Sequence, residues 1–189
     1  MNTLAVQLWP GPSPTPQDGL FALLIHTAGS QRDAARRQIR LAAREALAAV
    51  LGAPIDNISI ASEPGTPPRI LLSGSQNLIG CSFSHDGDYA LAAFNLQGPI
   101  GADLMHVQDI PDWQTVARDY LGPTVTAALQ TTSNRPHAFT QAWTQREAAL
   151  KCHAHQIREW QSDLPGYSIP LALPVAGLLG HIHIGDRRA

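Results

Sequence analysis

The chain has 189 residues, which is enough to bury a hydrophobic core as one domain or as two small halves packed together. Hydrophobic residues make up 44% of it and charged residues 15%, a balance typical of globular and not of disordered proteins. The formal net charge of −2 argues against a nucleic-acid-binding domain, and no run of Lys or Arg suggests a membrane-surface patch.

The cysteines and the apolar segments favour a cytoplasmic protein. Cys81 and Cys152 have no partner at the spacing of a metal or redox motif, so we expect reduced thiols. The short apolar stretch at 4–9 has no basic residue before it and prolines directly after it, unlike a signal peptide. No apolar run is long enough to span a bilayer. We therefore expect neither a membrane nor a nucleic acid as partner.

The first half of the sequence alternates strand and helix patterns. A proline-rich connector at 10–18 precedes an apolar run that predicts a buried strand over 20–26. Apolar residues at helical spacing predict a helix over 31–51, with Ser30 as its N-cap and Gly52 as its stop. The elements expected next are a strand at 58–61, a turn at 64–68, and strands at 80–84 and 89–95 around a turn at 85–88.

The second half repeats this order of strand, helices and strands. Its strongest helix begins at Pro136, a residue favoured in the first turn, and extends to about His155. The other elements expected are a turn at 97–99, a strand at 100–104, helices at 112–121 and 123–130, and strands at 167–172 and 180–184. The arrangement predicts an α+β fold of two similar halves rather than a doubly wound parallel sheet.

The most informative stretch is W-T-x-R-E-A-x-x-K, which begins at Trp143 and lies on a strongly helical background. Trp143, Glu147 and Lys151 follow one another at intervals of four residues, so they share one side of the helix. A structural interpretation makes Trp143 a core residue and Glu147–Lys151 an ordinary ion pair of about 0.3 kcal/mol. The stretch alone does not decide between that interpretation and a catalytic one.

Two upstream segments carry further candidate residues. In a strand, Asp103 and Met105 point to one face while Ala102 and Leu104 point to the other. Ser84-His85 ends a strand before an Asp-Gly turn, an arrangement that is most often only turn chemistry. A nucleophilic triad is not expected, because no G-x-S-x-G elbow occurs in the sequence.

Together the three segments resemble the 4′-phosphopantetheinyl transferase superfamily in its single-chain, Sfp-type form. The marks of that family are an S-H pair, a G-x-D-x-E segment and a W-[ST]-x-[KR]-E-A-x-x-K segment. Here these marks stand at Ser84-His85, at Gly101 to Met105 and at Trp143 to Lys151. The arginine-rich helix and Gly65-Thr66-Pro67 resemble the family's N-terminal helix and its G-K-P turn, so that the resemblance covers about 31–155.

The resemblance implies a pseudo-dimer of two α+β halves, each a long helix packed on a small, mostly antiparallel sheet. We place the halves at 1–98 and 99–189, with the active site between them. It also implies a monomeric holo-[acyl-carrier-protein] synthase that moves 4′-phosphopantetheine from coenzyme A to a serine of an apo acyl or peptidyl carrier protein. The reaction would release 3′,5′-ADP and depend on Mg²⁺, with Mn²⁺ as an alternative metal. Carriers of fatty-acid, polyketide, aryl-polyene and non-ribosomal peptide synthesis all stay open.

The resemblance also assigns roles to particular residues. Asp103 and Glu147 would hold the metal against the coenzyme A diphosphate, because hard cations prefer carboxylate and phosphate oxygens. Lys151 would face the same diphosphate, and Glu147 would also serve as general base for the carrier serine. Ser84 and His85 would contact the 3′-phosphate. From the first helix, Arg37 is our first choice for the same phosphate, with Arg40 and Arg44 as alternates.

Two departures from the family pattern weigh on these roles. Met105 stands where the family has a second acidic residue, and a thioether is a poor ligand for Mg²⁺. We therefore expect weaker binding of the metal, with a water in that coordination place. Thr66 replaces the lysine of the G-K-P turn, for which Arg69 is a substitute. Both departures keep open an impaired or non-catalytic relative that binds coenzyme A or a carrier protein.

A pair of histidines near the C-terminus offers a candidate metal site. His181 and His183 share one face of the strand expected at 180–184. Two histidines in that position are more often surface residues, and this is our expectation for them.

Overall fold

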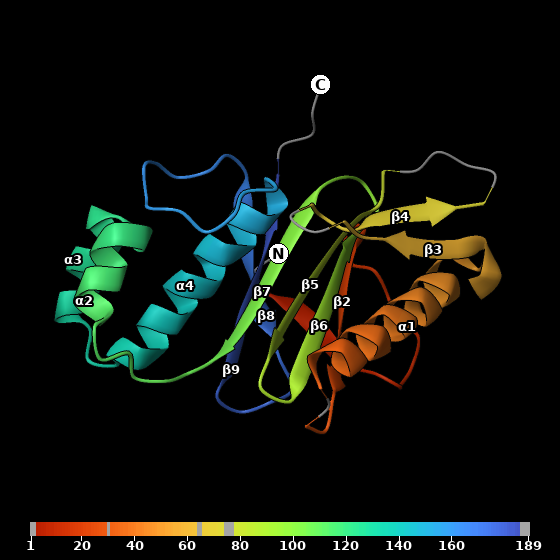
Figure 1. The fold of residues 1–189 in the computed structure, drawn as a ribbon, viewed down its shortest axis with the longest axis horizontal. Coiled ribbons are helices and arrows are strands. Elements are labelled where there is room, and N and C mark those ends of the chain that lie inside the picture. Colours follow the sequence, from red (N-terminus) through yellow and green to blue (C-terminus); the bar gives the residue numbers. More distant parts are fainter. Residues whose placement is uncertain (1–2, 30, 64–65, 74–77, 186–189) are drawn as a thin grey trace.

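The computed structural model describes residues 3–29, 31–63, 66–73 and 78–185. Within them, nine strands form one sheet in the order β3-β4-β5-β6-β2-β1-β8-β9-β7 (Figure 1). The strands are β1 (Leu4–Leu8), β2 (Leu20–His26), β3 (Ile58–Ala61), β4 (Arg69–Leu72), β5 (Gly80–Asp86), β6 (Tyr89–Asn95), β7 (Ile100–His106), β8 (Tyr167–Ala172) and β9 (Leu178–Ile184). The helices are α1 (Arg32–Leu51), α2 (Trp113–Val116), α3 (Pro123–Thr131) and α4 (Arg135–Cys152). The predicted α+β class is confirmed.

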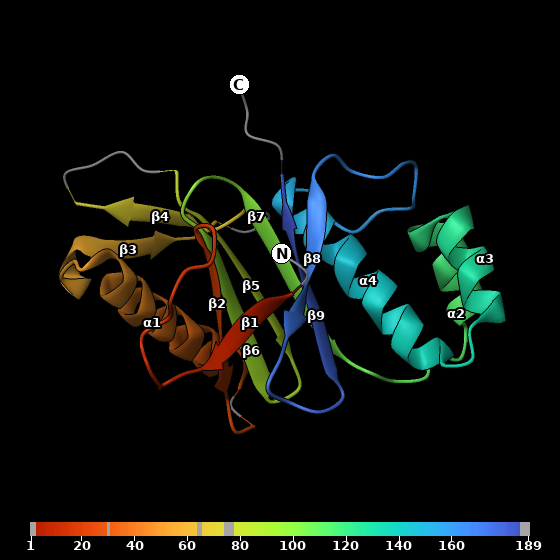
Figure 2. The same ribbon diagram turned by 180° about the vertical axis from the view of Figure 1, so that it is seen from behind.

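Strand β1 joins the strands of the first half of the chain to those of the second. It pairs in parallel with β2 on one side and with β8 on the other, as Figure 2 shows from behind. All other pairs in the described sheet are antiparallel. Neither β1 nor β4 was predicted as a strand, because each is short and gains most of its order from its neighbours.

The sheet curls until β7, at one end of the order, lies beside β5. Three backbone N–H groups of β7 donate to side chains of β5 at alternate positions. Ala102 N donates to Ser82 Oγ over 2.9 Å, Leu104 N to Ser84 Oγ over 3.3 Å, and His106 N to Asp86 Oδ2 over 2.7 Å. We call this contact the seam. Side-chain acceptors thus satisfy the donors of a strand edge that would otherwise be left unpaired.

Two hydrophobic clusters lie on opposite faces of the curled sheet. The inner cluster includes Leu24, Leu91, Leu104 and Ile182, all at most 3% exposed. On the outer face, α1 packs Ile39, Ala43 and Leu47 among the residues that surround Phe94. Helix α4 covers β7 and β9, and α2 and α3 flank its far side (Figures 1 and 2).

The long helices begin and end close to the predicted positions. Helix α1 ends at Gly52, which adopts the left-handed conformation with φ 61° as a helix stop does. The proposed N-cap, Ser30, lies outside the described residues. Helix α4 ends three residues before His155, because Ala154 adopts φ 57° and the N–H of His155 turns back to Leu150 O.

The region between β7 and α4 differs from the prediction in its detail. The helix expected at 112–121 is a short α2 that continues as a π-helical segment, Ala117–Leu121. Gly122, with φ 86°, then separates it from α3. No helix in the described part of the chain is long and apolar enough to cross a membrane.

Candidate functional site

Helix α4 and strand β7 approach each other unusually closely at Gly101. A Cβ atom on Gly101 would collide with the carbonyl oxygen of Ala148 and the backbone nitrogen of Cys152. This explains physically why a glycine stands two residues before Asp103, since only a residue without a side chain lets the helix lie so low on the strand. The same approach brings the polar side of α4 over the middle of β7.

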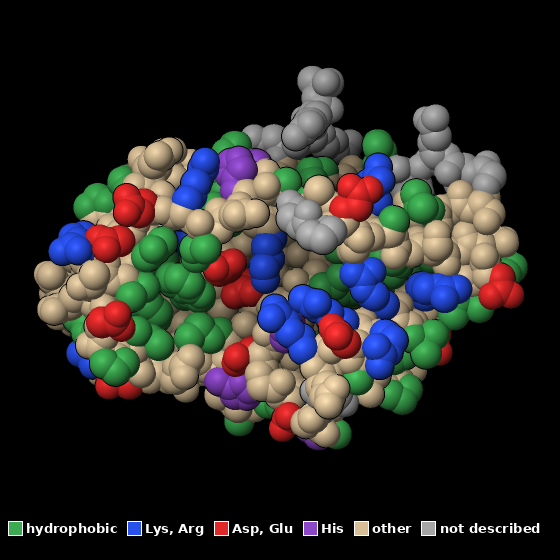
Figure 3. All heavy atoms as spheres, in the orientation of Figure 1, with side chains coloured by type: hydrophobic (Ala, Val, Ile, Leu, Met, Phe, Trp, Pro, Cys, Tyr) green, Lys and Arg blue, Asp and Glu red, His purple; other side chains and the backbone are tan. Residues whose placement is uncertain are grey.

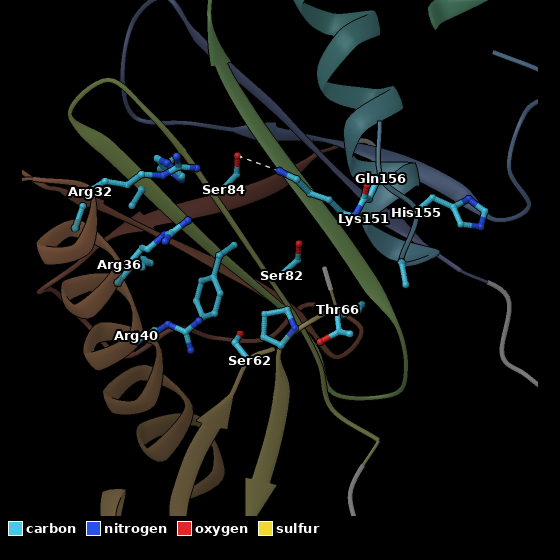
Figure 4. Close-up of a pocket in the computed structure, with 18 residues that line it drawn as sticks. Arg32, Arg36, Arg40, Ser62, Thr66, Ser82, Ser84, Lys151, His155 and Gln156 are labelled. Carbon is cyan, nitrogen blue, oxygen red and sulfur yellow. Dashed lines mark hydrogen bonds between the residues drawn. The ribbon is translucent and has the colours of Figure 1, made fainter. Parts of the chain in front are cut away.

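Asp103 and Lys151 form an ion pair across this contact. Lys151 Nζ lies 2.6 Å from Asp103 Oδ1, and the Asp103 side chain is only 10% exposed. The same ammonium group donates to Ala102 O over 3.2 Å and to Ser84 Oγ over 3.4 Å, the second of which is drawn in Figure 4. The Ser84 hydroxyl in turn donates to Asp103 Oδ1 over 2.7 Å. The predicted residues from three separate segments therefore meet at one point.

Glu147 lies one helical turn before Lys151 on α4 and is partly buried. Burial raises the pKa of its carboxyl group, and the neighbouring Asp103 carboxylate raises it further. Lys151 and Arg146 oppose that shift. A second carboxyl group therefore stands near Asp103, with a pKa moved toward neutral pH.

A cavity of about 340 Å³ opens beside these residues, between α1, β5 and the end of α4. Figure 3 shows Lys and Arg side chains gathered across this face, next to acidic side chains. The charged side chains that line the cavity include Arg32, Arg36, Arg40 and Lys151, which Figure 4 labels together with the polar residues Ser82, Ser84 and His155. His85 lines the cavity as well. The cavity is thus suited to an anionic ligand.

His85 faces the helix side of β5. Burial lowers the pKa of its imidazole, and Arg32, Arg36 and Lys151 lower it further through their positive charges. The alternation of the strand places Phe83 on the same side, where its ring lies 5.5 Å beneath the Arg40 guanidinium. His85 therefore lies beside several cationic side chains that disfavour its own positive charge, a setting that favours contact with an anion.

The arginines of α1 divide differently from the prediction. Of the three predicted residues, only Arg40 lines the cavity. Arg37 is exposed and not among the lining residues, because it stands about 100° around the helix from its neighbour Arg36. Arg44 donates instead to the backbone oxygens of Ile58 and Ile55, over 2.8 and 3.1 Å.

Sequence reasoning missed two arginines of the cavity, Arg32 and Arg36. Positions 32, 36 and 40 recur every four residues and so share one face of a helix, but this spacing does not say which face of α1 meets β5. In the turn that precedes β4, Thr66 lines the cavity, and Gly65 lies outside the described residues. Arg69 is not among the lining residues and lies 3.7 Å from Glu63 in an exposed ion pair.

The donor set near Asp103 fits Mg²⁺ only if the substrate completes it. Among the described residues, no group of three or more His, Cys, Asp and Glu side chains is placed to hold a metal. Asp103 and Glu147 offer two carboxylates, and Mg²⁺ is commonly bound by one or two carboxylates together with phosphate oxygens and waters. Ser84 and Lys151 both contact Oδ1 of Asp103. Neither residue contacts the other carboxylate oxygen of Asp103 through these two bonds. Met105 is partly exposed at the position where the family has a second acid.

The two C-terminal histidines are buried, which corrects the expectation that they are surface residues. His181 is 7% exposed and its Nδ1 lies 2.8 Å from Thr144 Oγ1 on α4. Burial lowers its pKa to about 4. His183 is 4% exposed and contacts Ser168 Oγ and Pro165 O. Both side chains are hidden because α4 and the loop that follows it cover this face of β9.

Comparison with known proteins finds a similarity in the C-terminal part of the chain. A search among curated proteins found no match. The family model of the 4′-phosphopantetheinyl transferase superfamily matches residues 99–169, a segment that begins just before β7 and includes α4. This match supports a transferase that acts in phosphopantetheine transfer in general. Residues 99–169 are therefore similar to the 4′-phosphopantetheinyl transferase superfamily, in agreement with the resemblance of the motifs around Asp103 and Glu147.

Proposed function

We propose that the chain is a Mg²⁺-dependent phosphopantetheinyl transferase that uses coenzyme A to modify an apo acyl or peptidyl carrier protein. The observation that carries this proposal is the meeting of Asp103, Glu147 and Lys151 at the edge of a cavity lined by arginines. Asp103, Glu147 and Lys151 suit the diphosphate of coenzyme A, where the phosphoryl transfer would take place. The arginines of the cavity suit the additional phosphate that coenzyme A carries at its 3′ position.

In the cavity, we assign the 3′-phosphate to His85 and to the arginine row of α1, namely Arg32, Arg36 and Arg40. Guanidinium groups pair with phosphate through two parallel hydrogen bonds, which gives geometry as well as charge. A bound phosphate dianion would also raise the pKa of His85 and favour its protonated, donating form. This assignment replaces Arg37 and Arg44, which are not among the residues that line the cavity.

At the diphosphate, the residues of α4 and β7 would position the reacting groups and remove the proton of the carrier serine. Asp103 and Glu147 would hold Mg²⁺, which when bound neutralises charge on the diphosphate oxygens. Glu147 would accept the proton of the carrier serine, directly or through a water, and its raised pKa suits that role. The ammonium group of Lys151 would interact with the diphosphate as well as with Asp103.

The covalent change is a single transfer of phosphorus between two oxygens. The serine oxygen of the carrier forms a bond to the phosphorus next to the pantetheine arm. The bond from that phosphorus to the bridging oxygen breaks, and 3′,5′-ADP leaves with the electron pair. The serine proton passes to Glu147. Positioning and charge neutralisation supply most of the rate in such transfers.

Further parts of the proposal concern organisation and setting. The packing of α1 on the first strands and of α4 on the last ones supports a pseudo-dimer of halves at 1–98 and 99–189. The seam supports an active site between them, because it joins β5 of the first half to β7 of the second. We further propose a cytoplasmic monomer, and we leave the carrier among those of fatty-acid, polyketide and non-ribosomal peptide synthesis.

Intact-mass analysis of a panel of apo carrier proteins tests the proposal. Each carrier is incubated with coenzyme A, Mg²⁺ and this protein, and we expect at least one to gain the mass of phosphopantetheine. Glu147→Gln and Lys151→Ala should each abolish the gain while Glu159→Gln, on an exposed residue away from the cavity, retains it. Undiminished transfer by both variants would disprove the mechanism.

A second candidate is a non-catalytic relative that binds coenzyme A or a carrier protein. The residue Met105 favours it, since a carboxylate is missing at the edge of the metal site, and Thr66 in place of a lysine favours it further. Coenzyme A binding by calorimetry without release of 3′,5′-ADP, across the same panel and with Mg²⁺ and Mn²⁺, would establish this alternative.

A further inference from the structure

The hydroxyl group of Ser84 is fully occupied within the protein. A serine hydroxyl has one hydrogen to donate and two lone pairs that accept. Ser84 donates its hydrogen to Asp103 Oδ1 over 2.7 Å and accepts from Leu104 N and Lys151 Nζ over 3.3 and 3.4 Å. The residue is 6% exposed. No capacity is left for a further strong hydrogen bond.

This occupation conflicts with contact to a phosphate. A phosphate dianion has only acceptor oxygens, so Ser84 would have to withdraw its single hydrogen from Asp103 to bind one. That contact is the shortest of the three and is charge-assisted, which makes it the most costly to break. His85 has no such conflict, since strand alternation turns it to the opposite side of β5, toward Arg32 and Arg36.

We infer that Ser84 is a positioning residue that holds the Asp103 carboxylate and the Lys151 ammonium in place, and that it does not bind the 3′-phosphate. The inference rests on the proposed function, within which it divides the Ser84-His85 pair into two separate roles. His85 serves the phosphate and Ser84 serves the metal-binding carboxylate.

The seam explains how Ser84 performs this role. The side chains of Ser82, Ser84 and Asp86 each accept a hydrogen bond from a backbone N–H of β7. Ser84 in addition donates to the Asp103 side chain. It fixes Oδ1, together with Lys151, and neither of these two contacts uses the other carboxylate oxygen, which stays available for a cation. A rotation of Asp103 would be needed to undo this, and its burial leaves little space for one.

The chain offers a closely matched control at Ser82. Its hydroxyl lies two residues earlier on the same face of β5, is 4% exposed, and accepts an equivalent bond from Ala102 N over 2.9 Å. Ser82→Ala therefore removes one rung of the seam without removing a contact to Asp103. Any effect that follows only from weakening the seam should appear equally in Ser82→Ala and Ser84→Ala.

The test measures binding without turnover, in the absence of any carrier protein. Mn²⁺ affinity is measured by electron paramagnetic resonance, with coenzyme A present and with the protein alone. Affinities for coenzyme A and for 3′-dephospho-coenzyme A are measured by calorimetry in EDTA. The proteins compared are the wild type, Ser84→Ala, Ser82→Ala and His85→Ala, with urea unfolding of each as a check on folding.

We expect Ser84→Ala to weaken Mn²⁺ binding about tenfold, because it removes a hydrogen bond to a charged group. Its preference for coenzyme A over the dephospho form should stay within about twofold of the wild type, while His85→Ala lowers that preference about tenfold. Ser82→Ala should lose less stability than Ser84→Ala, which also removes contacts to two charged groups, and should keep its Mn²⁺ affinity within about twofold.

Two results would overturn the inference. One is loss of the preference for coenzyme A in Ser84→Ala with unchanged Mn²⁺ affinity, which would make Ser84 a phosphate ligand. The other is an equal loss of Mn²⁺ affinity in Ser82→Ala, or no Mn²⁺ binding by the wild type. If the wild type binds neither nucleotide, the proposed function fails; if it binds coenzyme A and Mn²⁺ while Ser84→Ala keeps the wild-type Mn²⁺ affinity, the inference alone fails.

Discussion

The ammonium group of Lys151 lies 2.6 Å from Oδ1 of Asp103 and so ties the last turn of α4 to the middle of β7. Lys151 is the only lysine in the chain, which has twelve arginines. A lysine suits this place because its compact charge also reaches the backbone oxygen of Ala102 and the hydroxyl of Ser84, whereas a guanidinium is broad and planar.

Lys151→Ala should lower the free energy of unfolding by about 2 kcal/mol, because it leaves the Asp103 carboxylate nearly buried without its cation. Lys151→Arg should recover less than half of this loss. Arg69→Ala provides the control, because its ion pair with Glu63 is exposed and worth no more than about 0.5 kcal/mol. Urea denaturation at pH 7.5 measures all three variants. Equal losses for Lys151→Ala and Arg69→Ala would contradict the importance of the pair.

Glu147→Gln should make the protein more stable at neutral pH while it abolishes transfer. The folded protein raises the pKa of Glu147 above its unfolded value, so ionisation of this group costs stability as the pH rises through that range. The neutral amide avoids this cost. Thermal or urea unfolding at pH 7.5 checks the direction, with Glu159→Gln as the exposed control. A Glu147→Gln variant that is less stable than the wild type would contradict this prediction, because it would mean that contacts in the folded protein stabilise the ionised carboxylate.

Arg36→Ala should weaken coenzyme A binding about tenfold, because it removes a charge-assisted hydrogen bond to the phosphate. Arg37→Ala should change the affinity less than about twofold. The two residues are adjacent on α1, but Arg36 lines the cavity and Arg37 is not among the residues that line it. Arg36→Ala should also reduce the dependence of binding on salt concentration. Calorimetry at two ionic strengths measures both effects, and the reverse order of the two variants would restore the original assignment of Arg37.

Gly101→Ala should separate α4 from β7 and cost about 3 kcal/mol of unfolding free energy, because its Cβ collides with backbone atoms of the helix. Gly177→Ala is the control, since its φ of 76° strains an alanine by about 1 kcal/mol while no atom lies within 4 Å of the added Cβ. Lys151 reports the separation directly, because it is the only lysine that an acylating reagent can modify. Faster acylation of Lys151 in Gly101→Ala than in Gly177→Ala is the expected result, and equal rates would contradict it.

His181 should make the protein less stable in mild acid. Its pKa is about 4 in the folded protein and near 6.5 in the unfolded chain, so the unfolded chain binds the proton first as the pH falls. Between pH 7 and pH 5 we expect a loss of about 2 kcal/mol from this group. His181→Gln, which cannot titrate, should show a pH dependence smaller by that amount. Urea unfolding at the two pH values measures it, and parallel behaviour of both proteins would rule the contribution out.

The local patterns of the sequence were sufficient for most elements and for the chemical identity of the site. The periodicity of apolar residues predicted α1, and a proline at a favoured first position predicted α4, both nearly to their ends, because these signals lie in the residues of the helix itself. The motif spacing pointed to Asp103, Glu147 and Lys151, and the ion pair between Asp103 and Lys151 joins two of them in the structure. The short strands β1 and β4 escaped prediction because their order comes from distant neighbours.

The sequence by itself determined which residue types were available: two carboxylates, one lysine, a serine–histidine pair and a row of arginines at helical spacing. Only the tertiary structure decided which of them meet. Whether Arg36 or Arg37 faces the cavity depends on how α1 is rotated against β5, which no local pattern reports. Whether Ser84 serves a phosphate or Asp103 depends on the seam, where strands that are twenty residues apart in the chain exchange hydrogen bonds. Burial of His181 likewise follows from the packing of α4 over β9, since long-range packing and not local sequence sets the solvent exposure of a side chain.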